Sequence, residues 1–252
     1  MSSNFLNSPY ENIPNELLSQ FTMNGAIPLL NWFFDGSKKQ KIVWSSNYID
    51  KFLAKFSLKN VESGTVGEES YDGISALLLN CFQKNGIMSK KVAVVGSETP
   101  WIEAILLNLN NQVTTIEYNV PEVQDDRINC LSYSDFTLSK KEFDCIVTFS
   151  SIEHSGLGRY GDGLNPNGDI EAMQTIHSNL KSDGIVIWGA PVGHDAVVWN
   201  AHRIYGKIRL PLIFENFDEM EWFGFQKDDL LNLPLQSFVF QPIVSLCKKK
   251  LS

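Results

Sequence analysis

Two residues near the middle of the chain have the types and the spacing of a nucleotide-binding site. Gly96 ends a short apolar run, and Glu117 follows 21 residues later at the end of a second run. In nucleotide-binding βαβ units, a glycine lets the backbone approach the ligand, and an acid at about this distance binds the ribose hydroxyls. The pair predicts a bound ribose. A glycine that only ends a strand and a solvated glutamate are the alternative interpretation.

The turn after Gly96 indicates which nucleotide would fit. A dinucleotide fingerprint needs further glycines at two positions that hold Glu98 and Trp101. The Glu98 carboxylate would repel a pyrophosphate, but it would not repel a cationic ligand. S-adenosylmethionine carries a sulfonium, an ammonium and a ribose, so we expect this cofactor rather than NAD. The predicted cofactor-binding residues of this turn are Gly96, Ser97, Glu98 and Glu117.

A long glycine-rich segment follows a strongly apolar run that ends at Phe149. Residues 156–168 contain five glycines. Loops behind strands carry function because the sheet positions them, and long ones are often lids or binding loops. We therefore expect a substrate loop, in which Arg159 and Tyr160 bind the substrate and Asp162 is a catalytic candidate. A network of turns held by asparagine and glycine is the alternative.

His154 is the first candidate for proton transfer. It follows the same apolar run, and a histidine with an ordinary pKa of about 6.5 suits a base at neutral pH. Support of the cofactor pocket or of the loop is the alternative role. The neighbouring Ser150 and Glu153 are expected to bind the cofactor, with Glu153 fixing the loop rather than acting chemically.

A second polar cluster follows the predicted strand at 185–188. A helix over residues 195–205 would bring four side chains to one face: Asp195, Trp199, His202 and Arg203. On this face His202 is a further catalytic candidate, and Arg203 could hold a substrate carboxylate or phosphate. His194 is a second substrate-binding candidate, and a salt-bridged helix that only packs on the loop is the alternative. The histidines and aspartates of both clusters match no known metal-ligand spacing, so we predict no metal.

The elements that must position these residues change in character near residue 90. Before it, the spacing of apolar residues predicts helices over 15–23, 49–56 and 74–82. After it, strands alternate with two helices, which are predicted to be capped by Thr99 and Asp169. The predicted strands are 92–95, 113–118, 129–131, 144–149, 185–188, 221–225 and 237–247, and the helices are 100–109 and 170–180.

Alternating strands and helices imply right-handed crossovers and a parallel sheet. We predict an α/β fold with a doubly wound, mostly parallel Rossmann-like sheet over residues 90–252. The last two strands form an antiparallel hairpin on its edge. Residues 1–89 are predicted to be a helical N-terminal extension.

Several strings of the chain resemble a known superfamily. The order of a strand ending in glycine, an acid after the second strand, FDCIVTFSSIEH and LKSDGIVIWGAP is similar to class I S-adenosylmethionine-dependent methyltransferases. More narrowly, VVGSETPWIEA, TTIEYN, SSIEHSGLGRYGDGLNPNGDIEAM and PVGHDAVVWNAHRIYG resemble an uncharacterised domain-of-unknown-function family related to those enzymes. The resemblance implies a methyltransferase-like fold. The chain departs from the superfamily at Ser97 and Glu98, where glycines are usual.

Composition limits the partners. The chain has 252 residues and a formal net charge of −8, which argues against a nucleic acid as the main partner. Its basic runs at 38–41 and 248–250 are short, and its four cysteines lack metal spacing. Neither a secretory signal nor a long apolar stretch is recognised, so we expect a cytoplasmic protein with a small-molecule substrate and no membrane partner.

Three functions fit these observations to different degrees. The first is methyl transfer from S-adenosylmethionine to an oxygen or nitrogen of a small or medium-sized acceptor. The second is a non-catalytic binding protein of the same fold, which Glu98 favours. The third, a nicotinamide-dependent oxidoreductase, lacks the required glycines. An open pocket beyond Gly96 favours the first function, whereas a pocket filled by Trp101 and the loop 156–168 favours the second.

Overall fold

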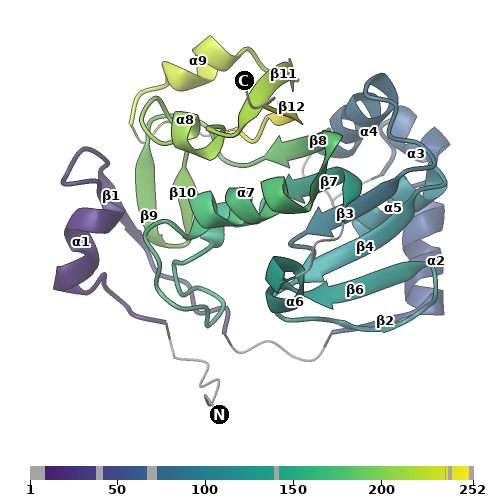
Figure 1. Ribbon diagram of the computed structural model, residues 1–252, viewed down its shortest axis with the longest axis horizontal. Coiled ribbons are helices and arrows are strands. Elements are labelled where there is room, and N and C mark those ends of the chain that lie inside the picture. Colours follow the sequence, from purple (N-terminus) through teal and green to yellow (C-terminus); the bar gives the residue numbers. More distant parts are fainter. Residues whose placement is uncertain are drawn as a thin grey trace.

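A computed structural model describes residues 9–37, 42–66, 73–138, 142–235, 237 and 240–249. The molecule is built around a seven-stranded sheet with helices on both faces (Figure 1). This arrangement confirms the predicted α/β fold with a doubly wound, mostly parallel sheet. The basic run at 38–41 lies outside the described residues.

The large sheet has the strand order β11-β12-β8-β7-β3-β4-β6. Five neighbouring strands are parallel, namely β8 (Leu180–Gly189), β7 (Phe143–Phe149), β3 (Lys91–Val95), β4 (Gln112–Glu117) and β6 (Ile128–Ser132). The antiparallel pair β11 (Phe217–Phe223) and β12 (Ile243–Lys248) closes one edge, as predicted. The chain runs outward from β3 to β6 and then returns to β7, so the strand order reverses between β3 and β7. Ligand sites of doubly wound sheets lie at this point.

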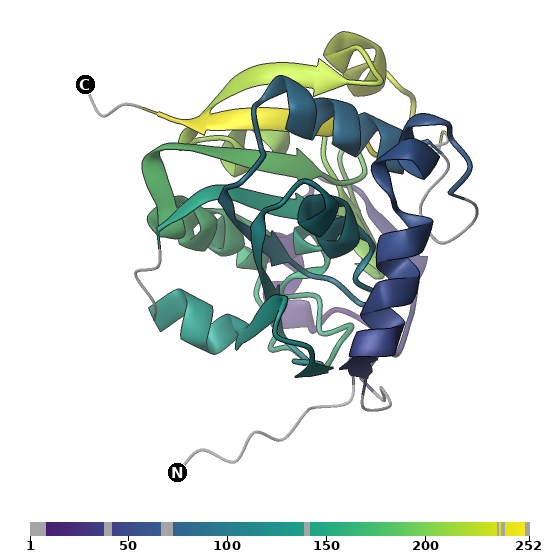
Figure 2. The same cartoon turned by 90° about the vertical axis from the view of Figure 1, so that its right-hand side faces the viewer.

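Side chains of the parallel strands alternate between two cores. On β3, Val92 and Val94 pack into one core, while Ala93 and Val95 pack into the other. The first core is covered by α2 (Ser46–Lys55), α3 (Leu58–Glu62), α4 (Ile74–Lys84) and α5 (Trp101–Asn108). The second is covered by α6 (Tyr133–Leu138), α7 (Gly168–Asn179), α8 (Leu210–Ile213) and α9 (Lys227–Leu231). Figure 2 shows the N-terminal helices, in blue, in front of the sheet.

The N-terminal part contains two short strands in addition to helices. After α1 (Asn15–Phe21), β1 (Leu29–Trp32) pairs in parallel with β9 (Ala196–Asn200), which also pairs with β10 (His202–Ile204). A third sheet joins β2 (Val43–Ser45) to β5 (Glu122–Gln124). The segment before residue 90 is therefore bound to the rest of the chain by strand pairing as well as by helix packing.

The structure corrects three local predictions. Residues 195–205 form strands β9 and β10 rather than a helix, because β1 and β10 satisfy the backbone hydrogen bonds of β9. Pro100, and not Thr99, occupies the N-cap of α5. Asp169 lies inside the first turn of α7 and its carboxylate binds arginines, so it does not cap this helix.

Within the described part of the chain, every helix is too short or too polar to cross a lipid bilayer.

Candidate functional site

A pocket of about 880 Å³ opens at the carboxyl ends of β3, β4 and β7. This volume is in the range of sites that hold a cofactor or a drug-sized ligand. The residues that follow the three strands line it, together with part of the loop 155–168 and the end of β1. Trp101 does not fill the pocket, because its ring packs against Phe56 and Phe149 in the wall, with centroids 6.0 and 5.9 Å apart.

Gly96 brings the first strand end against the residues that follow β7. Its φ is +79°, a conformation that side chains rarely adopt, and a Cβ at this position would overlap the Ser151 side chain. Ser150 also has a positive φ, 49°, which is uncommon for a residue other than glycine. The two strand ends therefore meet closely at the floor of the pocket, and only glycine fits at position 96.

Glu117 is held in a fixed orientation at the end of β4. The backbone N–H of Ser97 donates a hydrogen bond to its Oε1, and the N–H of Tyr118 donates to its Oε2 at 3.0 Å. A carboxylate oxygen has two lone pairs and can accept from more than one donor. The sequence spacing thus corresponds to a direct contact between the turn after β3 and the acid after β4.

Glu103 supports this turn and was not among the predicted site residues. It is fully buried, and it accepts hydrogen bonds from Ser97 Oγ at 3.0 Å and from Thr115 Oγ1 at 2.8 Å. Burial raises its pKa to about 7. The signal in the sequence is a single acid within the apolar helix α5, which only the packed structure connects to the turn.

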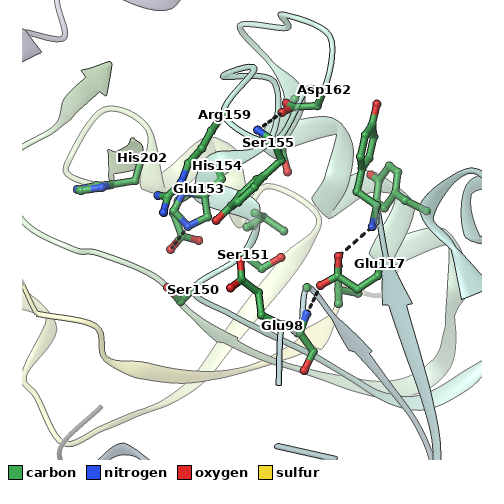
Figure 3. A pocket seen from close by; sticks show the side chains of 18 of the residues that line it. Glu98, Glu117, Ser150, Ser151, Glu153, His154, Ser155, Arg159, Asp162 and His202 are labelled. Carbon is green, nitrogen blue, oxygen red and sulfur yellow. Dashed lines mark hydrogen bonds and ion pairs between the residues drawn. The ribbon is translucent and has the colours of Figure 1, made fainter. Parts of the chain in front are cut away.

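Acidic groups collect on one side of the pocket. Figure 3 shows Glu98 and Glu117 on this side, while Glu153, His154 and His202 lie on the other. The Glu98 side chain is exposed and lines the pocket without closing it.

Glu153 and His154 lie on the short 3-10 helix η1 (Ile152–His154) directly after β7. Glu153 is only 1% exposed, and no described residue makes a hydrogen bond of normal geometry to either of its carboxylate oxygens. Its Oε1 lies 3.6 Å from His154 Nε2. Burial raises the pKa of Glu153 to about 7. The Ser151 backbone and the Ser150 side chain lower this pKa by a smaller amount.

His154 has the opposite shift. Burial, and then the charge of Arg159, lower its pKa to about 3. Its Nδ1 lies 2.6 Å from the carbonyl oxygen of Ala201, so Nδ1 carries the proton of the neutral ring and donates it there. The bare Nε2 then faces the carboxyl group of Glu153. The structure corrects the expectation that His154 has an ordinary pKa suited to a base at neutral pH.

Arg159 extends from the glycine-rich loop along the same wall. Its Nη1 donates to the carbonyl oxygen of Ala201 at 2.9 Å and lies 3.4 Å from His154 Nδ1. Its guanidinium carbon lies 4.5 Å from the ring centroid of Phe34. Tyr160 lines the pocket beside it, and burial raises the Tyr160 pKa to about 12.

The N-terminal strand β1 supplies a pocket wall that the sequence did not predict. Trp32 and Phe34 line the pocket, and the backbone N–H of Phe34 donates to Asn200 Oδ1 at 2.8 Å. The signal was the aromatic run at 32–34, but nothing local to it shows that β1 pairs with β9.

The glycine-rich loop is fixed by two charged groups, Asp162, which was predicted as a catalytic candidate, and Arg203, which was predicted to bind the substrate. Asp162 lines the pocket, yet its carboxylate accepts from the N–H groups of Gly156 at 2.8 Å and Tyr160 at 3.2 Å. It therefore holds the loop. Arg203 is fully buried and is not among the lining residues, because it donates to loop carbonyl groups, including that of Ser155 at 2.6 Å. The structure thus corrects its assignment to substrate binding.

A buried ion-pair network holds the other end of the loop. The Asp169 carboxylate accepts from Arg209 Nε at 2.8 Å and Nη2 at 2.5 Å, and lies 3.6 Å from Arg203 Nε. Tyr205 donates to the same carboxylate at 3.1 Å. α7 and the strand β10 are tied together through this one aspartate.

Of the two other histidines predicted at the site, one lies at the pocket and one does not. His202 lines the pocket, and burial lowers its pKa to about 4. His194 is exposed and does not line the pocket, which corrects its placement at the substrate. Within the described ranges, no three histidine, cysteine or acidic side chains gather in a geometry that could hold a metal ion.

The fold and the position of the pocket define a class of proteins, the class I methyltransferase fold. The structure is similar to that of 1,6-didemethyltoxoflavin-N1-methyltransferase from Burkholderia thailandensis, solved with 1,6-didemethyltoxoflavin and S-adenosylhomocysteine. The TM-score is 0.53 and the identity 12%, over 80% of this chain and 90% of that one. N-methyltransferase NodS from Bradyrhizobium japonicum has a TM-score of 0.47 and 9% identity, over 81% of this chain and 100% of that one.

The chain belongs to the family described as Caenorhabditis protein of unknown function, DUF268, whose model matches residues 89–250. This confirms the resemblance found in the sequence. A comparison with curated proteins gave no match.

Proposed function

We propose that the protein is an S-adenosylmethionine-dependent methyltransferase that acts on an oxygen or nitrogen atom of a small or medium-sized acceptor. The observation that carries the proposal is the open pocket beyond Gly96, in which the Ser97 N–H fixes the Glu117 carboxylate at the end of β4. A carboxylate at this point of a doubly wound sheet is placed to accept hydrogen bonds from ribose hydroxyls.

The pocket's shape and charge fit this cofactor. Gly96 lacks the Cβ that would overlap Ser151, so the backbone of the turn stays close to the pocket floor. Glu98 and Glu117 give this side of the pocket a negative character, which favours a ligand with a sulfonium and an ammonium and disfavours a pyrophosphate. Ser97, Glu98 and Glu117 would hold the cofactor, with Ser150 and Ser151 beneath it.

Bound S-adenosylmethionine supplies a methyl group that is already activated by its positive sulfur. The chain's own residues therefore have two tasks, to align the acceptor and to remove its proton. We assign the second task to Glu153, because its carboxylate is buried in the pocket wall and its pKa lies near neutral pH. His154 is fixed by the Ala201 carbonyl and lies beside Glu153 as part of the same pocket wall.

The test is a calorimetric titration with S-adenosylhomocysteine. Saturable binding of one equivalent is expected, and Glu117→Ala should weaken it by about 10- to 100-fold, the value of a lost charged hydrogen bond. The melting temperature should fall by only a few degrees, since the main loss to the fold is the hydrogen bond from the Ser97 N–H. The control is Glu215→Ala, which removes an exposed acid outside the pocket.

Absence of heat at millimolar ligand would contradict the proposal. It would instead favour a non-catalytic binding protein of the same fold, the alternative that rests on Glu98 in place of the usual glycine. Undiminished affinity in Glu117→Ala would contradict the ribose role alone.

A further inference from the structure

Arg159 differs from the other arginines of the chain in its lack of a carboxylate partner. The chain has four arginines, and three of them pair with aspartates, namely Arg127, Arg203 and Arg209. No acidic group in the described ranges lies within ion-pair distance of the Arg159 guanidinium, and its buried Nε has no hydrogen-bond partner there. Partial burial of a cation without a counter-charge is unfavourable in free energy unless a ligand or water binds to it.

The two histidines near Arg159 add no positive charge to this end of the pocket. His154 and His202 have pKa values of about 3 and 4, lowered first by burial and then by Arg159, so both rings are neutral at neutral pH. Among the described residues that line the pocket, Arg159 is therefore the only cation. Glu98 and Glu117 lie on the opposite side (Figure 3). Glu153 lies at this end too, but burial raises its pKa to about 7, so about half of its carboxyl groups are protonated at neutral pH. The net charge at this end is therefore positive, which suits an anion.

Aromatic side chains surround the same cation. Trp32 is 60% exposed at the pocket wall, and its indole meets the His202 ring edge to face at 5.9 Å. Phe34 and Tyr160 lie 4.5 and 5.1 Å from the Arg159 guanidinium carbon. Large exposed aromatic side chains in a pocket favour a flat apolar ligand, because they offer apolar area and ring contacts.

We propose that this end of the pocket is a subsite for a planar aromatic compound that carries an anionic group, a carboxylate or a phosphate. The anionic group binds the Arg159 guanidinium, and the ring lies against Trp32 and Tyr160. That such a compound is the methyl acceptor rests on the proposed function, whereas the subsite itself does not. A quaternary ammonium, which aromatic walls also attract, is excluded by the charge of Arg159.

Calorimetric titration without cofactor tests the subsite. The probes are 4-hydroxybenzoate, phenyl phosphate, the uncharged 4-hydroxybenzamide and the cationic benzyltrimethylammonium. Both anions should bind at millimolar concentration or below, the amide at least about tenfold more weakly, and the cation not at all. The stronger of the two anions identifies carboxylate or phosphate as the preferred group.

Two variants separate charge from ring recognition. Arg159→Gln should lower the affinity for both anions by about 10- to 100-fold and leave the amide unchanged, while Arg159→Lys should retain part of the affinity. Trp32→Leu should weaken all three of these aromatic probes, and it does not threaten the fold because Trp32 is exposed. The matched controls are Arg127→Gln and Phe33→Leu, which alter an exposed arginine and an exposed aromatic outside the pocket.

Failure of both anions to bind, equal affinity for the amide, or binding of the cation would overturn the inference. If Arg159→Gln weakened S-adenosylhomocysteine as much as the aromatic acids, Arg159 would hold the cofactor's carboxylate. That result would overturn the subsite and leave the proposed function intact. If the acids bound and S-adenosylhomocysteine did not, the proposed function would fail and the subsite would stand.

Discussion

At the scale of single residues, burial gives Glu153 and His154 protonation states that free side chains would not have. Desolvation disfavours the charged form of each group, so it raises the pKa of the carboxyl group and lowers that of the imidazole. Glu153 therefore titrates at about pH 7, and His154 stays neutral down to about pH 3. The carboxylate is the better base near neutral pH, because a catalytic base works best with a pKa near the working pH.

Turnover should follow the ionisation of Glu153. Since the base must be deprotonated, kcat should rise with pH up to about 7 and then level off, with no step from His154 between pH 5 and 9. Glu153→Gln should lower kcat by about 10²- to 10⁴-fold while the affinity for S-adenosylhomocysteine stays within a few-fold. Glu171→Gln, which removes another pocket acid, is the control.

A pH profile that keeps its rise in Glu153→Gln would assign the base to another group. Equal losses of kcat and cofactor affinity would instead make Glu153 a support of the cofactor site.

The sequence predicted much of the pocket wall around Gly96 and less of the wall around His154. Gly96, Ser97 and Glu117 follow consecutive strands at a recognisable spacing, and the structure brings them into contact. The pKa of His154 depends on its burial and on Arg159, which no local pattern encodes. Trp32 lies far from the glycine-rich loop in sequence, so its place beside His202 follows only from the pairing of β1 with β9.

At the scale of elements, the same limit explains the misassigned segment at 195–205. Its polar residues have helical spacing, yet Val197 and Val198 are β-branched and favour a strand. The decisive partner is β1, about 170 residues earlier in the chain, which pairs in parallel with β9. Long-range pairing of this kind leaves no trace in a window of ten residues. The strands of the central sheet and the helices that pack on it were predicted better, because each is recognisable from the apolar residues of its own short segment.

The Asp169 network should contribute strongly to stability. Asp169→Asn leaves the buried cations Arg203 and Arg209 without a counter-charge, so the free energy of unfolding should fall by about 3–5 kcal/mol in urea denaturation. Glu221→Gln is the matched control, because its ion pair with Lys84 is exposed and should contribute less than about 1 kcal/mol. Similar losses in the two variants would mean that the network does not fix the loop and α7 as described.

At the scale of the whole molecule, the N-terminal helices and the sheet share one core. Phe52 of α2 and Phe56, which follows this helix, pack in the same cluster as Ile105 of α5 and Val92 of β3. The N-terminal part also contacts the rest of the chain through the pairing of β1 with β9, which places Trp32 at the pocket. Residues before position 90 are therefore part of the site's wall as well as of the core.

This shared core predicts one cooperative thermal transition. Differential scanning calorimetry of the full chain should show a single peak, and saturating S-adenosylhomocysteine should move that whole peak to higher temperature, since a ligand of the native state stabilises everything that unfolds with it. Two peaks, of which only one responds to the ligand, would show that the N-terminal part unfolds independently.

The proposed function depends most on an adenosyl cofactor bound between the turn after β3 and the end of β4. A crystal structure of the chain grown with S-adenosylhomocysteine tests this directly. We expect density for the ligand in the pocket, with its ribose hydroxyls within hydrogen-bond distance of the Glu117 carboxylate and its sulfur toward Glu153. A pocket without ligand density at saturating concentration, or a ligand bound elsewhere, would contradict the account.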